Sequence, residues 1–290
     1  MHLSAILFAL SASLLFALAL IFTQYALRHA APNVGALISL AASTTLLWLL
    51  SPWLVDWHQF TLHAAAIFAA VGLLFPAAVT LLAYEGNRRM GPHIAGALGN
   101  LAPLYALVLA AVMLGEIPRL VQVLGVAAIM AGVLVLSLQR AGGRVMEPWW
   151  VVLIPLTAAA VRGFAQPVAK LGLVDWPDPF AATLISYSVS CLVILASSFL
   201  SGTWRKMVNL PRSPGLLWFV AVALCNATAV LLLYAALARG AVALVSPLVA
   251  TYPLATLVLG LILLRGEPVS LRLMSGVVLT VAGVVILIAF

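Results

Sequence analysis

The second half of this 290-residue chain repeats the first half. Each half contains, in the same order, a tyrosine, a glycine, a Pro-Leu pair, a Gly-Glu pair and two glycines. The first set is Tyr84, Gly91, Pro103, Leu104, Gly115, Glu116, Gly125 and Gly132, and the second is Tyr234, Gly240, Pro253, Leu254, Gly266, Glu267, Gly276 and Gly283. The offset stays at about 150 residues, and a fixed period of this kind marks a duplicated structural unit.

The two units lie in a chain with very few charges, which excludes an ordinary soluble domain. Hydrophobic residues make up 65% of the chain and charged residues only 7%, whereas soluble domains are about 25% charged. A spanning helix needs roughly 20 apolar residues, and roughly ten such stretches are present. They cover residues 3–27, 34–55, 63–84, 94–114, 120–138, 149–169, 180–200, 215–237, 242–264 and 271–290. The apolar runs do not alternate with polar residues, which excludes a transmembrane β-barrel.

Five stretches fall in each unit, and this odd number determines the expected architecture. A unit with an odd number of spanning helices leaves the next unit in the opposite orientation. We therefore predict an all-α membrane protein with ten transmembrane helices, arranged as two inverted five-helix repeats around a central cavity. The repeats should cover residues 1–145 and 146–290. The first stretch lacks a basic leading region and a clear cleavage site, so we interpret it as a membrane helix and not as a signal peptide.

The basic residues indicate how the chain is oriented in the membrane. They are scattered singly near the ends of the stretches, so the formal charge of +7 does not predict nucleic-acid binding. Connections after odd-numbered stretches carry ten of them: Arg28, Arg88, Arg89, Arg140, Arg144, Arg205, Lys206, Arg212, Arg265 and Arg272. Connections after even-numbered stretches carry three: Arg119, Lys170 and Arg239. The positive-inside rule then predicts a multi-pass inner-membrane protein with both termini in the periplasm.

The titratable residues argue against an enzyme and against tight ion coupling. All seven carboxylates and all five histidines are expected at or near helix ends, whereas proton- or sodium-driven carriers usually have a carboxylate deep in the membrane. Motifs such as HExxH and GxSxG are missing. Cys191 and Cys225 have no partner at metal-ligand spacing, so we interpret them as packing residues. We expect no enzyme activity, no metal and no cofactor.

Arg162 is the one ionisable residue inside an apolar stretch. An arginine in hydrocarbon is costly, so it faces protein or a water-filled cavity, or it extends to the membrane surface. In a cavity it would bind a carboxylate or phosphate of a substrate. Gln166 follows one turn later, and Pro167 there can break the helix and free a carbonyl group. Gln24 occupies the comparable depth in the first stretch, so all three polar residues are candidate substrate contacts.

A second polar cluster lies in the fourth stretch and in its repeat. Asn100 and Tyr105 flank Pro103, and the matching part of the ninth stretch contains Ser246, Thr251, Tyr252 and Pro253. Prolines with nearby amide or hydroxyl groups suit a kinked helix that faces a cavity, although packing alone could also explain them. We therefore add Asn100, Tyr105 and Tyr252 as candidate substrate contacts, with Pro103, Pro167 and Pro253 as helix-breaking or gating positions.

Other repeated residues have structural explanations. Tyr84 and Tyr234 lie near the ends of their stretches, where aromatic belt residues are typical. The glycine pairs of the fifth and tenth stretches each lie on one helix face, which predicts close helix packing or a dimer contact. Glu116 and Glu267 each follow a glycine in a short connection, so we expect them to cap the next helix or to bind an arginine.

At these residues the chain resembles the drug/metabolite transporter superfamily, in particular the ten-helix carriers with two EamA-type repeats. The matching marks are Pro103, Glu116, Gly125 and Gly132, which recur as Pro253, Glu267, Gly276 and Gly283. The resemblance covers essentially the whole chain. It implies an inner-membrane secondary carrier whose cavity is lined by helices 1, 3, 4, 6, 8 and 9. Helix 1 here lacks the glutamate that small multidrug relatives carry.

These observations favour an exporter of small metabolites, with amino acids as the first class, that works by alternating access. The absence of a deep carboxylate favours facilitated diffusion or exchange over proton coupling. A carrier for nucleotide sugars, phosphorylated sugars or lipid-linked sugars is the alternative, and it predicts several cavity cations because a phosphate usually binds more than one. A membrane-embedded transferase is a weaker alternative. The expected partners are the substrate and membrane lipids, with the chain as a monomer or a homodimer.

Overall fold

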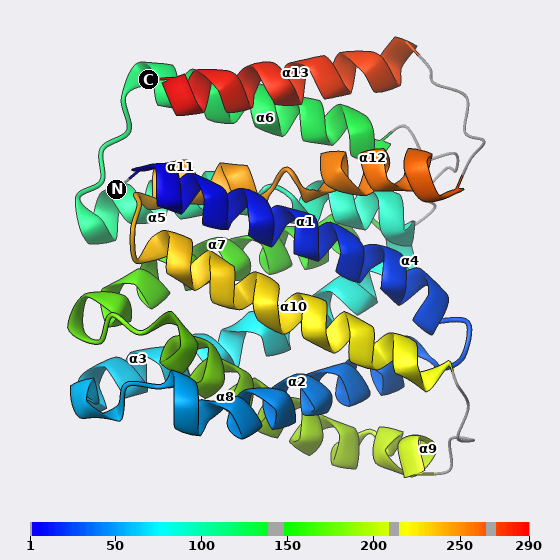
Figure 1. Cartoon of the computed structure of the whole chain (residues 1–290). Coiled ribbons are helices and arrows are strands. Elements are labelled where there is room, and N and C mark those ends of the chain that lie inside the picture. The colour runs from blue at the N-terminus through cyan, green and yellow to red at the C-terminus, as the bar shows by residue number, and fades with distance from the viewer. Residues whose placement is uncertain (1, 139–147, 209–214, 265–270, 290) are drawn as a thin grey trace.

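A computed structural model describes residues 2–138, 148–208, 215–264 and 271–289, and every secondary-structure element in them is a helix (Figure 1). The first half contains α1 (His2–Ala26), α2 (Pro32–Leu54), η1 (Trp57–Gln59), α3 (Leu62–Gly72), the π-helical η2 (Leu73–Ala78), α4 (Val79–Gly99), α5 (Ala102–Leu114) and α6 (Leu120–Leu138). The second half contains η3 (Trp149–Val152), α7 (Leu153–Asp175), α8 (Pro179–Leu200), α9 (Thr203–Val208), α10 (Leu216–Leu237), α11 (Val242–Val249), α12 (Tyr252–Leu264) and α13 (Leu271–Ala289).

Seven described helical segments are long and apolar enough to cross a membrane. They are Leu3–Ala26, Pro32–Leu54, Leu62–Ala83, Trp149–Asp175, Pro179–Leu200, Leu216–Leu237 and Val242–Leu259, and three shorter apolar helices are Ala102–Leu114, Leu120–Val135 and Met274–Ala289. All of them overlap the apolar stretches of the sequence. The prediction of an all-α, multi-pass membrane protein is therefore confirmed. The predicted boundary at residue 145 lies outside the described residues.

The helix boundaries differ from the sequence prediction in the first half. We expected a connection between residues 84 and 94, but α4 runs from Val79 to Gly99 without interruption. The interruptions lie instead at Phe75, whose extended backbone (φ −133°, ψ 125°) precedes Pro76, and at the turn of Asn100 and Leu101. A residue before proline disfavours the helical conformation. Hydropathy shows where a chain becomes polar, whereas these backbone restrictions decide where its helix ends.

The ninth predicted stretch is also divided. It consists of α11 and α12, separated by a turn at Ala250 and Thr251. Pro253 is the second residue of α12, and Pro103 is the second residue of α5. Prolines are well tolerated in the first turn of a helix, because the missing N–H has no helical acceptor there. The two halves therefore carry interrupted helices at corresponding positions.

Helix contacts between the halves come in matching pairs. In the two halves, α7 corresponds to α1, and α3 together with α4 corresponds to α10. The helix α1 packs along α10, and α7 likewise packs along α3 and α4. Likewise α5 packs on α7, and α12 packs on α1. The contacts of α2 with α8 and of α6 with α13 each join corresponding helices. These contacts therefore have matching partners when the two halves are exchanged.

The glycine faces of α6 and α13 pack directly against each other. A Cβ atom on Gly132 would lie 2.7 Å from the Gly276 carbonyl oxygen, and one on Gly283 would lie 2.7 Å from the Gly125 carbonyl oxygen. Real Cβ contacts are almost never this short, so the approach requires glycine. Because Gly125 faces Gly283 and Gly132 faces Gly276, the two helices run antiparallel. The predicted close packing therefore occurs inside one chain.

Two hydrogen bonds repeat the same relationship between the halves. The Ser43 hydroxyl of α2 donates to the Ala223 carbonyl of α10 at 3.0 Å. The Ser190 hydroxyl of α8 donates to the Gly72 carbonyl of α3 at 2.5 Å. Serine side chains commonly hold membrane helices together in this way. In Figure 1, α1 begins and α13 ends at one end of the bundle, and the connection from α1 to α2 lies at the other.

Candidate functional site

A cavity of about 980 Å³ lies between the two halves. Its described lining comes from α1, α2, η2, α4, α5, α7, α8, α10, α11 and α12, and includes no residue of α6 or α13. In α1 and α2 the lining residues fall between Phe16 and Ser43, which are the parts that flank the connection between these helices. The cavity therefore extends from that end of the bundle to its middle. Most of the lining is apolar, with a few polar side chains between.

Arg162 lies near the middle of α7 and lines the cavity. Close packing against α5 fixes this part of α7, because a Cβ atom on Gly163 would lie only 2.6 Å from the Ala102 carbonyl oxygen. Within the described residues, no hydrogen bond or ion pair engages Arg162, and its Nε atom is buried without a partner. A buried donor without an acceptor is costly. The arginine is therefore available for an anionic group in the cavity.

Gln166 lies one turn further along α7 and also lines the cavity. Its side chain is only 6% exposed, and its Oε1 atom has no hydrogen-bond partner among the described residues. An arginine donor and an amide acceptor thus lie on one face of α7. The expected helix break at Pro167 is wrong, because α7 continues through this residue. Proline removes only one helical hydrogen bond, and the packing of α5 at Gly163 supports the helix beside that gap.

Asn100 and Tyr252 meet in the cavity wall. Both residues line the cavity, and the Tyr252 hydroxyl donates a hydrogen bond to the Asn100 side-chain oxygen. Asn100 lies in the turn between α4 and α5, and Tyr252 is the first residue of α12. Pro103, in the first turn of α5, lines the cavity as well. The interruption between α4 and α5 and the start of α12 are therefore joined at the cavity.

Two of the predicted contacts lie elsewhere. Gln24 is exposed on α1, although its neighbour Thr23 lines the cavity. Successive residues of a helix point about 100° apart, so a residue next to a lining position need not line the cavity. Tyr105 lies where α5 contacts Gly163 of α7 and is not among the described lining residues. Neither Pro167 nor Pro253 is among them.

Several polar residues of the lining were not among the predicted substrate contacts. Tyr234 was interpreted as an aromatic belt residue, which is wrong, because it is only 1% exposed and lines the cavity. The side chain of its counterpart Tyr84 lies outside the described residues. Ser246, Asn226 and Tyr187 also line the cavity. Ser246 belongs to the polar stretch noted in the sequence, whereas a hydroxyl within an apolar run gives no signal of its own.

Glu85 departs from the expectation that every carboxylate lies near a helix end. It lies within α4 and lines the cavity. Its Oε1 atom is 2.5 Å from the Arg89 Nε atom, and both side chains are about one-third exposed, at 34% and 30%. Arg89 also lies over the Trp150 ring. Glu85 and Arg162 are the charged residues of the described lining, and Glu85 is already paired.

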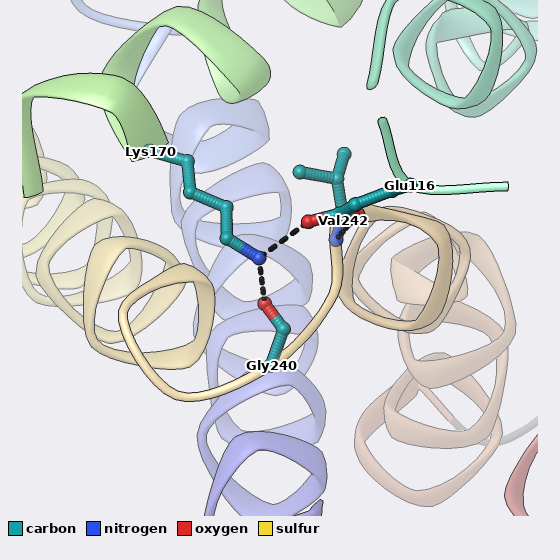
Figure 2. A network of polar contacts seen from close by, with 4 residues as sticks. All are labelled: Glu116, Lys170, Gly240 and Val242. Atoms are coloured by element: carbon teal, nitrogen blue, oxygen red, sulfur yellow. Dashed lines mark hydrogen bonds and ion pairs between the residues drawn. The ribbon is translucent and has the colours of Figure 1, made fainter. Parts of the chain in front are cut away.

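A polar network ties three segments together at the end of the bundle opposite the connection from α1 to α2 (Figure 2). The Lys170 ammonium donates to Glu116 Oε1 at 2.5 Å and to the Gly240 carbonyl oxygen at 2.6 Å. Glu116 Oε2 accepts the Val242 backbone N–H at 2.7 Å. Glu116 was expected to cap the next helix, α6, or to bind an arginine. It instead caps α11 and binds a lysine. Glu267 lies outside the described residues.

Nothing in the described part of the chain offers a metal site, since no three His, Cys, Asp or Glu side chains converge there. The helix N-terminus at Val242 is already occupied by Glu116. The described lining of the cavity offers the unpaired cation Arg162, several hydrogen-bonding groups and a large apolar surface. These are the components of a site for a small amphipathic ligand.

Comparisons with known proteins agree with this arrangement. The model of the EamA-like transporter family matches the chain twice, over residues 3–138 and 148–289. A solved structure titled "Crystal structure of protein" is similar in fold, with a TM-score of 0.79 and 20% sequence identity over 99% of this chain and 96% of the other. A search of curated proteins finds no match. The two matched segments include almost every described helix, and the chain belongs to the EamA-like transporter family.

Proposed function

We propose that this protein is a secondary transporter that exports small metabolites, most favourably amino acids, across the inner membrane. The observation that carries the proposal is the unpaired Arg162 in the middle of α7, beside the cavity. A guanidinium group binds a carboxylate through two parallel hydrogen bonds. Exporters and other carriers of small solutes bind their substrate near the middle of the membrane, between the two halves.

The surroundings of Arg162 support an amino acid over a simple anion. Gln166 Oε1 is a buried acceptor without a partner, one turn from the arginine. In this proposal Arg162 binds the carboxylate of the substrate, and Gln166 accepts a hydrogen bond from its ammonium group. Asn100 and Tyr252 contact the remaining polar atoms from the other wall. The apolar lining then accommodates the side chain.

The antiparallel contact of α6 and α13 supports ten membrane crossings in two inverted repeats. These helices are counterparts in the two halves, so their opposite directions imply opposite orientations of the halves. The matching contacts of α1 with α10 and of α7 with α3 and α4 agree with this symmetry. Transport would then proceed by rocking of one half against the other, which exposes the cavity to each side in turn.

The basic residues suggest which side the cavity faces. The connections at the cavity end follow odd-numbered spans, and these carry ten basic residues, whereas the connections at the other end carry three. The positive-inside rule then assigns the cavity end to the cytoplasm and the termini to the periplasm. In this orientation the cavity is open to the compartment from which an exporter collects its substrate.

The alternative of a phosphorylated-sugar or nucleotide-sugar carrier receives less support. A phosphate carries up to two negative charges and usually binds several cationic groups. The described lining contains one arginine, Arg162, and one carboxylate, Glu85. The charges of these two groups sum to zero, which supports an overall neutral substrate with one carboxylate, such as an amino acid, over a phosphate.

Reconstituted liposomes provide the test. Arg162→Ala should weaken transport of amino acids while the protein inserts and purifies normally, because a lost charge-assisted hydrogen bond costs about 1.5–3 kcal/mol, or roughly a 10- to 150-fold rise in KM. Arg162→Lys should restore only part of the activity, since a point charge lacks the bidentate geometry. Arg119→Ala, which removes an exposed cation outside the cavity, is the matched control. Normal amino-acid transport by Arg162→Ala would refute the proposal.

A further inference from the structure

Two lining residues of the cavity, Gln166 and Ser246, each lie one helical turn from a residue of the network in Figure 2. In that network Lys170 of α7 binds the Gly240 carbonyl oxygen, and Glu116 binds the N-terminus of α11 at Val242. Gln166 lies one turn before Lys170, and Ser246 lies one turn after Val242, both toward the middle of the bundle. The contacts that hold α7 beside the start of α11 thus bring these two lining residues to the same depth.

Two buried hydroxyl groups of the described cavity lining have no partner in hydrogen-bonding geometry. They are the Ser246 hydroxyl, on a residue that is 2% exposed, and the Tyr234 hydroxyl, on a residue that is 1% exposed. Both residues line the cavity. Buried hydroxyl groups are nearly always hydrogen-bonded, so each exception requires an explanation.

Other hydroxyl groups of the cavity wall show the usual arrangement. The Ser43 hydroxyl donates to Ala223, that of Thr23 to Ala19 and that of Thr80 to Pro76, in each case to a backbone carbonyl oxygen. Ser246 and Tyr234 differ from these because neither hydroxyl lies in hydrogen-bonding geometry with a backbone carbonyl oxygen, although the Ser186 side chain lies close to the Tyr234 hydroxyl. A hydroxyl rotates freely about its C–O bond, so both can donate to or accept from a ligand in the cavity.

The charges of the neighbouring network are already balanced. Lys170 and Glu116 form an ion pair with each other, and the remaining Glu116 oxygen binds Val242. A second charged group on the ligand would therefore have no free opposite charge among the described lining residues. Burying a charge without an opposite charge beside it is costly. An uncharged group that both donates and accepts hydrogen bonds fits two free hydroxyls.

We infer that Ser246 and Tyr234 form a subsite for an uncharged polar group on the substrate side chain, a hydroxyl or a carboxamide. This inference rests on the proposed function, because it assumes that Arg162 holds the carboxylate of the same substrate. It predicts a preference among amino acids of equal size. Threonine should be transported better than valine, and asparagine better than leucine, because each pair differs mainly in polar atoms.

The test is competitive transport of each pair into liposomes that contain the full-length protein. The wild-type ratio of kcat/KM should favour threonine over valine and asparagine over leucine by about tenfold, the effect of one or two neutral hydrogen bonds. Ser246→Ala and Tyr234→Phe should each bring both ratios close to one. Ser198→Ala should leave the ratios unchanged, because this buried hydroxyl donates to the Leu195 carbonyl oxygen and Ser198 is not among the described lining residues.

The possible outcomes separate this inference from the proposed function. If both members of a pair are transported at equal rates, and Arg162→Ala abolishes both, the subsite is refuted while the transport proposal stands. If the ratios persist in Ser246→Ala and in Tyr234→Phe, the preference arises elsewhere and the subsite is also refuted. If no amino acid is transported at all, both proposals fail. Purification yield and thermal unfolding of each variant identify any loss of folded protein.

Discussion

The Tyr252 hydroxyl donates a hydrogen bond to the side-chain oxygen of Asn100, and this contact joins the start of α12 to the turn between α4 and α5. One partner belongs to each half, so the bond spans the boundary across which the halves would move in the proposed transport cycle. Tyr252→Phe removes the donor and leaves the buried Asn100 oxygen unsatisfied, which costs about 1–3 kcal/mol.

We expect Tyr252→Phe to lower the midpoint of thermal unfolding in detergent by several degrees. Tyr25→Phe is the control, since Tyr25 stacks on Trp218 and its hydroxyl forms no hydrogen bond in the described structure. An unchanged midpoint in Tyr252→Phe would show that the contact contributes nothing to stability.

The network of Lys170, Glu116 and Val242 lies at the end of the bundle opposite the opening of the cavity. We predict that it keeps this end closed. Lys170→Met removes the ion pair and the bond to Gly240, which together contribute about 1–3 kcal/mol. We expect a cysteine at Ala243, a position that is 4% exposed, to react roughly tenfold faster with a water-soluble thiol reagent in this background. Cys191 and Cys225 would be replaced by alanine for this measurement.

A suitable control for that experiment lies at the same end of the bundle. His63→Ala breaks the contact between His63 and Asp175, whose side chains are 75% and 40% exposed, respectively. Exposed ion pairs contribute only about 0–1 kcal/mol to stability. The reactivity of the cysteine at Ala243 should not change. Equal reactivity in His63→Ala and Lys170→Met would exclude a closing role for Lys170.

Gly132 should tolerate no side chain. In Gly132→Ala the new methyl group would lie 2.6 Å from the Thr280 backbone nitrogen and 2.7 Å from the Gly276 carbonyl oxygen. Overpacking of this kind costs about 1–3 kcal/mol. We expect lower thermal stability in Gly132→Ala but not in Gly99→Ala, where nothing lies within 4 Å of the new atom. Equal stability of the two variants would contradict the close packing of α6 on α13.

Glu85 lines the cavity, but we predict that it does not drive transport by taking up protons. Its carboxylate is held by Arg89, 2.5 Å away. Glu85→Gln retains an acceptor for Arg89, so downhill transport into liposomes should continue at a similar rate with and without a pH gradient. Loss of a proton-dependent flux with unchanged substrate binding would instead identify Glu85 as the coupling group.

The orientation of the chain can be tested directly. A fluorescent protein that matures only in the cytoplasm, fused after Phe290, should remain dark if the termini are periplasmic. The same protein fused within the connection after α1 should fluoresce. Bright fluorescence from the fusion at Phe290 would reverse the proposed orientation.

The sequence identified the helical membrane architecture and part of the cavity for physical reasons. Arg162 and Gln166 stand out because polar side chains are costly in an apolar stretch, and both line the cavity. Asn100 and Tyr252 stand out because they lie near prolines. Each of these signals is local, so one stretch of sequence is enough to show it.

The features that the sequence did not predict depend on contacts between distant segments. The proposed role of Tyr234 and Ser246 depends on which groups lie beside their buried hydroxyls, and that is decided by the helices that surround them. Gln24 is next to the lining residue Thr23, but its side chain points in a different direction around the helix. Composition does not reveal this direction. The capping of α11 by Glu116 joins residues that are far apart in the chain.

The antiparallel contact of α6 with α13 has a consequence for biosynthesis. The helix α6 ends at Leu138, and α13 begins only at Leu271. At ordinary rates of translation, the ribosome needs on the order of ten seconds to make the chain between them. During that time the glycine face of α6 has no α13 beside it, so the first half remains incompletely packed until the last helix of the chain has been made.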